Sequence, residues 1–301
     1  MYPHSRRLLS KSDLFENLGL CSLKLLSEID FYAPSDYVLV SGSLVEGFGN
    51  RLSDIDVLVI GQEESRNTTI FHSKTLQRWV DVTYLSLPAL QAHMYSLPNF
   101  NIDLSQWGDC RPAPFEALEM IHDVCYGVVI SEPWICEPLP RNDRTMNILR
   151  QSWALSNIIT ARARWQDAVG ALQDGQNYQA QYMRNICIGH CIDAYTSLNG
   201  ETDINVKWRF AKLARVRASG KDVIGLSDYF VGHSSLDTLS WSDAAQLLFD
   251  VICLFVKGCL YEAPSSPLQE GERFEIDSGR WVCVTGNGTS QVVPAPSLRP
   301  I

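Results

Sequence analysis

The segment that most constrains how this chain can fold is a predicted strand–turn–strand unit at residues 37–60. An apolar run at residues 37–40 predicts a buried strand, which Gly42-Ser43 ends before a short helical turn, and residues 54–60 predict a second buried strand. Two aspartates open this second strand, although the rest of it is apolar. Two carboxylates therefore enter a core strand together.

These carboxylates belong to Asp54 and Asp56. Because side chains alternate along a strand, both point to one face, while Ile55 and Val57 point to the other. Two neighbouring anions repel each other, and a protein normally accepts this where a cation lies between them. Oxygen ligands suit Mg²⁺, which completes its coordination with water and substrate phosphates. The spacing therefore predicts a metal site at which a phosphate compound binds.

Gly42 and Ser43 supply the other half of such a site. Glycine lets the backbone approach a phosphate closely, and a serine hydroxyl with the N–H groups at a helix start can bind its oxygens. Gly-Ser by itself is a turn more often than a phosphate site, and Asp-x-Asp by itself is usually a solvated strand face or a loop. Found together and in this order, the two motifs predict one site.

Together these residues resemble the signature of the polymerase-β type nucleotidyltransferases: a Gly-Ser turn, a variable spacer, and an Asp-x-Asp or Asp-x-Glu pair on the following strand. The spacer here ends at Ser53 and contains small polar residues that these enzymes commonly carry there. The resemblance is close over residues 37–86 and looser beyond them. It implies a third carboxylate on a neighbouring strand, and the β-prone run at residues 79–84 offers Asp81.

The resemblance implies transfer of a nucleoside monophosphate from a nucleoside triphosphate, with ATP as the first candidate, to a hydroxyl group, with release of pyrophosphate. Asp54, Asp56 and Asp81 are the expected catalytic and metal-binding residues, holding two Mg²⁺ ions that Mn²⁺ can replace. The expected nucleotide-binding residues are Gly42, Ser43, Ser53 and Lys207. Asp81 is also a candidate to take the proton of the acceptor.

A basic stretch in the second half of the chain provides the reason for including Lys207. Residues 207–217 together with Lys221 contain six lysines and arginines and no acid. A cation from this stretch would stabilise the triphosphate or the leaving pyrophosphate. The alternative is a solvated helix face balanced by flanking acids such as Asp203 and Asp222, and both interpretations stay open. Lys207 is named first because the helical domains of the small-molecule nucleotidyltransferases that this chain resembles often place a basic residue near the phosphates.

The acceptor is left open by the sequence. One catalytic domain with one helical partner resembles the antibiotic-modifying and natural-product nucleotidyltransferases, which adenylylate a small hydroxylated acceptor. An acidic chain would suit an acceptor that bears amines. Two alternatives remain: protein adenylylation, as in the minimal nucleotidyltransferase antitoxins of toxin–antitoxin pairs, and a non-catalytic nucleotide-binding regulatory protein. The presence of all three carboxylates favours an enzyme.

Net charge, cysteine content and hydropathy indicate which binding partners and which cellular compartment to expect. The net charge of −9 disfavours a polyanionic partner such as tRNA or DNA. The nine cysteines are scattered, with no Cys-x-x-Cys pair and no secretory leader, which predicts free thiols and a cytoplasmic location. Cys187, His190 and Cys191 lack a fourth ligand nearby and are interpreted as ordinary helix residues. The most apolar run, residues 247–256, is too short to span a bilayer and contains Asp250, so no membrane association is expected.

The predicted fold class is α+β, in three parts. Residues 1–135 are expected to form a small mixed-sheet catalytic domain that begins with a helix at residues 12–29. Residues 136–263 should form a helical bundle, and residues 264–301 a short β-rich tail. The proline-rich stretch at residues 133–140 marks the first boundary. The bundle helices are expected at residues 150–169, 176–198, 204–218 and 241–261.

Overall fold

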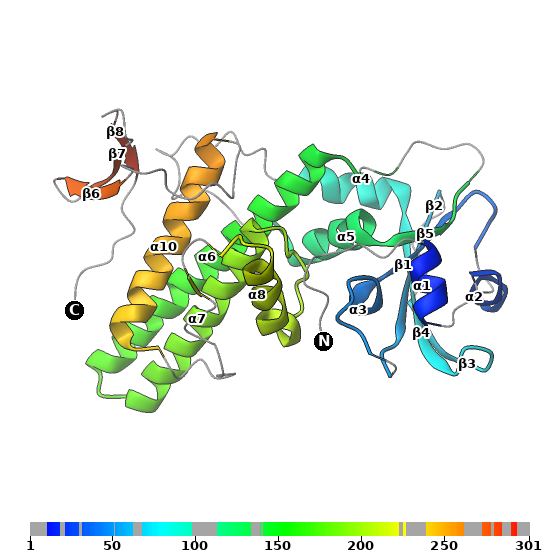
Figure 1. Ribbon diagram of the computed structural model, residues 1–301, viewed down its shortest axis with the longest axis horizontal. Helices are drawn as coiled ribbons and strands as arrows, with labels where there is room; N and C mark the ends of the chain where they lie inside the picture. Colours follow the sequence, from blue (N-terminus) through cyan, green and yellow to red (C-terminus); the bar gives the residue numbers. More distant parts are fainter. Residues whose placement is uncertain are drawn as a thin grey trace. The chain divides into compact units, whose positions relative to one another are not determined.

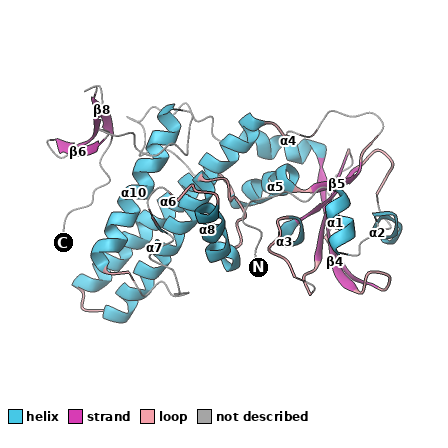
Figure 2. Ribbon diagram, in the orientation of Figure 1, coloured by secondary structure: helices cyan, strands magenta, loops and turns pink. Residues whose placement is uncertain are grey.

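The computed structural model of this 301-residue chain describes residues 11–18, 22–29, 32–50, 52–62, 68–97, 113–133, 139, 141–222, 225–226, 239–261, 273–277, 280–284 and 290–293. They form a five-stranded mixed sheet, a set of helices and a separate three-stranded sheet (Figure 1). The α+β class predicted from the sequence is confirmed. Strands and helices alternate in the first part of the chain, and helices dominate from residue 143 to residue 261 (Figure 2).

The described chain divides into two compact units. The described residues of the first lie within 11–97, Ala113–Leu149 and Thr202–Ser219, and those of the second lie within Arg150–Glu201 and from Gly220 onward. The segment Thr202–Ser219 therefore packs with the unit that contains the five-stranded sheet, although it lies within the predicted helical domain. The predicted domain limits at residues 135 and 263 stay predictions.

The five-stranded sheet has the strand order β3-β4-β2-β1-β5. Strands β2 and β4 are parallel, and the other neighbouring pairs are antiparallel. The strands are β1 (Tyr37–Ser41), β2 (Ile55–Gly61), β3 (Thr69–Ser73), β4 (Arg78–Ser86) and β5 (Val128–Ser131). The helices of the same unit are α1 (Lys11–Leu18), α2 (Ser22–Glu28), α3 (Gly42–Val45), α4 (Leu87–Ser96), α5 (Phe115–Tyr126), the start of α6 (Asp143–Gln173), the 3₁₀ turn η2 (Val206–Trp208) and α8 (Arg209–Ala218).

The two faces of this sheet are covered by different helices (Figure 1). On one face the core contains Leu14 of α1 and Leu25 of α2 with valines of the central strands, such as Val57 and Val82. On the other face Leu58 and its neighbours pack against α4 and α5. Because side chains alternate along a strand, this second face also receives Asp56 and Asp81. The candidate site lies on this second face, at Asp56 and Asp81.

The helical part differs from the prediction in its details. Two helices, α1 and α2, occupy the region predicted as one helix at residues 12–29. Helix α6 begins at Asp143, earlier than the predicted residue 150, and the predicted helix at 204–218 is divided between η2 and α8. Asn142 explains the early start of α6, because its side-chain oxygen accepts a hydrogen bond from the Thr145 N–H group at 2.9 Å and so caps the first turn.

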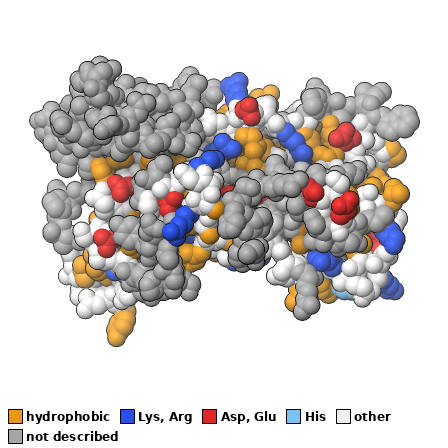
Figure 3. Space-filling model, in the orientation of Figure 1, with side chains coloured by type: hydrophobic (Ala, Val, Ile, Leu, Met, Phe, Trp, Pro, Cys, Tyr) orange, Lys and Arg blue, Asp and Glu red, His pale blue; other side chains and the backbone are white. Residues whose placement is uncertain are grey.

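The second unit contains most of α6 with α7 (Asn177–Leu198), α10 (Trp241–Tyr261) and the small strands. Helices α7 and α10 pack against each other. The strands β6 (Arg273–Asp277), β7 (Arg280–Val284) and β8 (Ser290–Val293) form an antiparallel sheet in the order β6-β7-β8, as the alternation in the tail predicted. Among the described helices, none combines the length and the hydropathy needed to cross a membrane. On the face shown in Figure 3, acidic and basic side chains are interspersed with apolar ones.

Candidate active site

The turn after β1 is built closely around one carboxylate. Gly42 has φ +71°, a conformation that L side chains rarely adopt, and a Cβ atom at this position would overlap the Oδ2 atom of Asp56. The turn is closed on itself, because the N–H groups of Phe48 and Gly49 donate hydrogen bonds to the Ser43 carbonyl oxygen at 2.9 and 2.7 Å. Glycine is therefore required at position 42, both for the backbone and for the space that the Asp56 carboxylate takes.

Three carboxylates meet at the end of this turn. Ser41 of β1 lies opposite Asp56 of β2, which in turn lies beside Asp81 of β4, so these residues form one row across the sheet. We call Asp56 and Asp81 the aspartate row. Asp54 directly precedes β2 rather than lying within it. All three aspartates line a cavity of about 390 Å³, together with Ser43. The Oδ1 atom of Asp81 is buried and accepts no hydrogen bond from the described residues.

The three neighbouring aspartates give the site excess negative charge, as the pKa values of Asp56 and Asp81 indicate. Burial, followed by the charges of Asp54 and Asp81, raises the pKa of Asp56 to about 6. Burial and the charge of Asp54 also raise the pKa of Asp81. The charge of Lys207 acts in the opposite direction on Asp56 and lowers its pKa. A bound cation would therefore be stabilised by all three carboxylates.

The opposite side of the cavity is also acidic. Helix α5 contributes Glu119 and Asp123, and the segment before η2 contributes Asp203. Burial raises the pKa of Asp123 to about 7, and it also raises the pKa of Glu119. Burial, and then the charge of Glu46, raises the pKa of Asp203. In the described part of the chain, the carboxylates that line the cavity are Glu46, Asp54, Asp56, Asp81, Glu119, Asp123 and Asp203, and the cation that lines it is Lys207.

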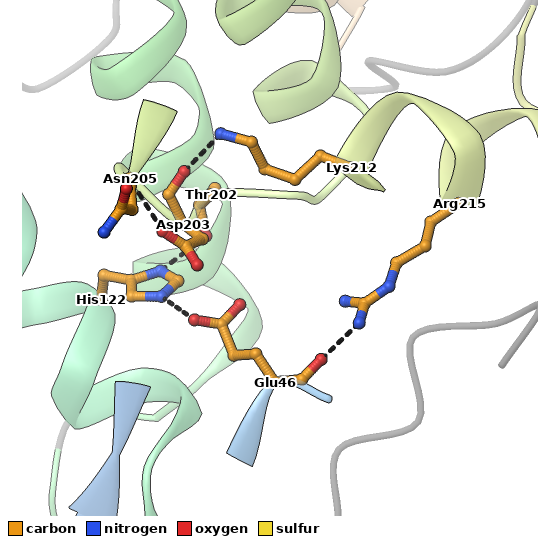
Figure 4. Close-up of polar contacts among 7 residues, drawn as sticks. All are labelled: Glu46, His122, Thr202, Asp203, Asn205, Lys212 and Arg215. Carbon is orange, nitrogen blue, oxygen red and sulfur yellow. Dashed lines mark hydrogen bonds and ion pairs between the residues drawn. The ribbon is translucent and has the colours of Figure 1, made fainter. Parts of the chain in front are cut away.

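A buried histidine connects the two sides (Figure 4). Nε2 of His122, on α5, lies 2.7 Å from Oε1 of Glu46, which follows α3. Nδ1 of the same ring lies 3.0 Å from Oγ1 of Thr202. Glu46, His122 and Thr202 are all buried. We call these three residues the Glu46–His122–Thr202 link, and it ties the end of the Gly42-Ser43 turn to the segment that carries Lys207.

Cations of α8 strengthen this connection (Figure 4). Nη2 of Arg215 donates a hydrogen bond to the Glu46 carbonyl oxygen at 2.5 Å, and Nζ of Lys212 donates one to the Asp203 carbonyl oxygen at 2.6 Å. The Arg215 guanidinium lies 3.7 Å from the centre of the Phe48 ring. Phe48 stacks in turn on Trp208, with ring centres 5.4 Å apart. Part of the basic stretch is therefore structural, because Lys212 and Arg215 are buried.

The structure brings together most of the residues predicted for the site. Gly42, Ser43, Asp54, Asp56, Asp81 and Lys207 all line the cavity. Ser53 does not line it, and its hydroxyl accepts a hydrogen bond from the Asn50 N–H group at 2.9 Å, within the spacer. Asp103 and Asp109 are the next candidates that the sequence offers for the third carboxylate if it is not Asp81, and both lie outside the described residues.

Several cavity residues were not expected from the sequence. Glu119, His122 and Asp123 fall on one face of α5 at spacings of three and four residues, a pattern that a helical reading of residues 115–126 could have revealed. Glu46 and Asp203 carry no local signal of this kind. From the sequence alone, Asp203 is interpreted only as an acid that flanks and balances the basic stretch.

The donor chemistry of the aspartate row fits a divalent cation. Its ligand atoms are carboxylate oxygens, and Asp81 Oδ1 has no hydrogen-bond donor in the described part of the chain. Burial, and then the charges of Asp54 and Asp81, raise the pKa of Asp56. Within the described residues, no group of three or more Asp, Glu, His or Cys side chains is arranged as a metal centre. The residue types nevertheless suit Mg²⁺, because carboxylate oxygens are its preferred protein ligands.

No protein-family model and no curated protein sequence matches this chain. Among solved structures, it is similar to a nucleotidyltransferase-like protein from Exiguobacterium sibiricum, with 15% sequence identity and a TM-score of 0.33. The match covers 80% of this chain and 76% of that protein. At this identity and TM-score, the site is interpreted from the residues of this chain.

Proposed function

We propose that this chain transfers a nucleoside monophosphate, with AMP as the first candidate, from a nucleoside triphosphate to a hydroxyl group of a small-molecule acceptor, releasing pyrophosphate. The observation that carries the proposal is the row of Ser41, Asp56 and Asp81 beside the Gly42-Ser43 turn, at one cavity that Asp54 and Lys207 also line. A close backbone turn, adjacent carboxylates and a lysine are the groups that a triphosphate and its cations require.

In this proposal the triphosphate lies over the Gly42-Ser43 turn. The turn at Gly42 brings the backbone close to the Asp56 carboxylate, and Ser43, which lines the same cavity, donates a hydrogen bond from its hydroxyl to a phosphate oxygen. Lys207 lies close enough to Asp56 to lower its pKa. We propose that its ammonium group stabilises the charge that develops on the leaving pyrophosphate.

We propose that Asp54, Asp56 and Asp81 bind Mg²⁺, with Mn²⁺ as a substitute. When bound, the ions would polarise the α-phosphate and lower the pKa of the acceptor hydroxyl. The acceptor oxygen forms a bond to the α-phosphorus, and the bond from that phosphorus to the oxygen bridging the β-phosphorus breaks, so pyrophosphate leaves with the electron pair. Asp81 takes the hydroxyl proton at Oδ1, which has no donor among the described residues and whose carboxyl pKa is raised by burial.

The charge of the cavity favours an acceptor that bears amines. Among the described residues, seven carboxylates line it, at Glu46, Asp54, Asp56, Asp81, Glu119, Asp123 and Asp203, against one lysine. Metal ions and Lys207 would be occupied by the triphosphate. The acids of α5 would remain for the acceptor, and a cationic group next to Glu119 and Asp123 would favour their charged forms. A polyanionic acceptor would be repelled.

The experiment incubates purified protein with ATP, GTP, CTP or UTP and Mg²⁺ against a panel of hydroxylated amines, scoring pyrophosphate and the mass of each new product. EDTA and the Asp56→Asn variant are the controls, and both should abolish product. A mass increase on a protein in place of a small molecule would favour the adenylylation of proteins. Tight binding of a triphosphate without pyrophosphate release from any acceptor would favour a regulatory nucleotide-binding protein.

A further inference from the structure

A stack of alternating cationic and aromatic side chains lies beside the candidate active site. The Arg215 guanidinium covers the Phe48 ring, with its central carbon 3.7 Å from the ring centre. Phe48 stacks on Trp208, with ring centres 5.4 Å apart and planes at 12°. The Nζ atom of Lys207 lies over the Trp208 ring, 5.2 Å from its centre. We call Arg215, Phe48, Trp208 and Lys207 the cation–aromatic stack, and all four residues belong to the first unit.

Burial decreases from one end of this stack to the other. Arg215 and Phe48 are buried, Trp208 is half-buried and Lys207 is exposed. The buried end is fixed, because Arg215 also donates its hydrogen bond to the Glu46 carbonyl oxygen. At the exposed end, both Trp208 and Lys207 line the cavity. The stack therefore connects the core of the unit to an ammonium group at the cavity.

Phe48 also belongs to the turn that carries Ser43. Its N–H group donates a hydrogen bond to the Ser43 carbonyl oxygen at 2.9 Å, while its ring contacts the Trp208 indole. The backbone of Phe48 therefore holds the Ser43 turn closed. Its ring, through Trp208, supports Lys207. One residue thus connects the two groups to which the proposed function assigns the phosphates.

We propose that Phe48 and Trp208 are positioning residues of the triphosphate site, which hold the Lys207 ammonium group in place beside the Gly42-Ser43 turn. The inference rests on the proposed function, because that function assigns Lys207 to the phosphates. A long lysine side chain has many rotamers, and ordering them when a ligand binds weakens affinity. Contact with the indole restricts these rotamers before the nucleotide arrives.

The indole and a phosphate can contact the ammonium group at the same time. An ammonium group has three N–H donors, and the ring covers only one side of it, so the other side is left for phosphate oxygens. The contact between Lys207 and Trp208 therefore persists in the complex. It follows that the stack raises affinity for the phosphate chain itself, whichever base is attached. An indole that stacked on the nucleobase would instead raise affinity for ATP and not for a bare phosphate chain.

The test measures the binding of Mg-tripolyphosphate and of Mg-ATP to the full chain by calorimetry. Trp208→Leu should weaken both probes by the same factor, about two- to fivefold, as for loss of a cation–π contact at a partly exposed site. Trp208→Phe keeps a ring under the ammonium group and should retain most of the affinity. Phe48→Leu removes the support of the indole and should weaken both probes in the same way.

A matched control is Trp79→Leu, which removes an exposed indole of β4 that does not line the cavity. This variant should bind both probes as wild type does. Because Trp208 is only half-buried, Trp208→Leu should keep the circular dichroism spectrum of wild type. It therefore tests the stack even if Phe48→Leu, which changes a buried residue, fails to fold.

A double-mutant cycle tells positioning from general distortion of the site. Lys207→Met should weaken Mg-tripolyphosphate in wild type, and this effect should shrink in the Trp208→Leu background. The effect of Ser43→Ala should stay the same in that background, because the Phe48 N–H group still closes the turn. A merely structural role of Trp208 would reduce both effects together or neither of them.

Four results would overturn the proposal. Tighter binding of Mg-tripolyphosphate in Trp208→Leu would mean that the ammonium group leaves the indole when phosphate binds. A loss confined to Mg-ATP would assign the indole to the nucleobase. Unchanged affinity for both probes, or no binding of Mg-tripolyphosphate to wild type at millimolar concentration, would remove the stack from phosphate binding. Failure of the proposed function has a different outcome, in which Mg-tripolyphosphate affinity depends on Trp208 but no triphosphate yields pyrophosphate with any acceptor.

Discussion

Replacing His122 with phenylalanine tests the Glu46–His122–Thr202 link most directly. The substitution keeps a flat ring of similar size and removes both hydrogen bonds, of 2.7 Å to Glu46 and 3.0 Å to Thr202. The Glu46 side chain is only 2% exposed, so water cannot replace the lost partner easily. Breaking one side of a buried ionic contact typically costs 3–5 kcal/mol, and we expect a loss of about 3 kcal/mol because Arg215 still holds the Glu46 backbone.

A second substitution tells electrostatics from packing. In Glu46→Gln/His122→Phe the side chain at position 46 has no charge, so this double variant should regain about 1–2 kcal/mol relative to His122→Phe. The single variant Glu46→Gln retains a hydrogen bond to the ring and should lose about 1 kcal/mol. Urea unfolding in the presence of EDTA, followed by circular dichroism and tryptophan fluorescence, gives the three values.

The reasoning would be refuted if His122→Phe lost less than about 1 kcal/mol, or if the double variant were no more stable than His122→Phe. The same link should influence nucleotide binding, because it ties the Ser43 turn to the segment of Lys207. The dissociation constant for Mg-ATP should therefore rise in His122→Phe, and the effects of Ser43→Ala and Lys207→Met should then shrink in that background, since one phosphate chain can no longer reach both groups.

Three further predictions concern the site itself. Ser43→Ala should weaken Mg-ATP binding by about 1.5–3 kcal/mol in calorimetry, while Ser53→Ala, whose hydroxyl serves the spacer, should change it little; the reverse ranking would mean that the triphosphate lies elsewhere. Asp81→Asn should leave Mg-ATP affinity nearly intact and reduce turnover by orders of magnitude. Asp56→Asn should lower both the affinity and the turnover. Normal turnover in the Asp81 variant would remove this residue from the mechanism. Folding raises the Asp56 pKa from 3.8 to about 6, so the folded state favours the protonated carboxyl. The stability that this protonated carboxyl contributes is fully present below pH 4 and is lost as the pH rises through 6. In EDTA, Asp56→Asn should therefore be more stable than wild type at pH 8, with the difference vanishing near pH 4, and urea midpoints across this range check the sign.

The strands and the turn of the site could be predicted because their signals are local. The apolar runs around Gly42-Ser43 and the alternation from Asp54 onward involve neighbours in sequence, and the φ of +71° at Gly42 is a conformation that favours glycine. The β-prone run around Asp81 likewise predicted a strand, and the structure pairs that strand with β2. The role of each aspartate stays a prediction.

Sequence periodicity does not predict contacts between residues that lie far apart in the sequence and are brought together only by the fold. Glu46 and His122 are separated by 76 positions in the sequence, and Arg215 and Glu46 by 169. Lys212 and Arg215, interpreted from the sequence as a possible phosphate-binding face, are buried and hold the backbone of Asp203 and Glu46. Ser53, which the resemblance predicts as a nucleotide-binding residue, instead accepts a hydrogen bond from the nearby Asn50 N–H group.

The sequence by itself determined the α+β class, the central strands and the types of residue that carry the chemistry, since helix and strand periods and glycine turns depend on residues a few positions apart. The tertiary structure alone decided that α5 and the segment Thr202–Trp208 face the aspartate row, and that Phe48 stacks on Trp208. The physical reason is that these contacts depend on strand register and on which helix covers which end of a sheet face. Both are set by the packing of the whole unit around its core and not by any short stretch of the chain.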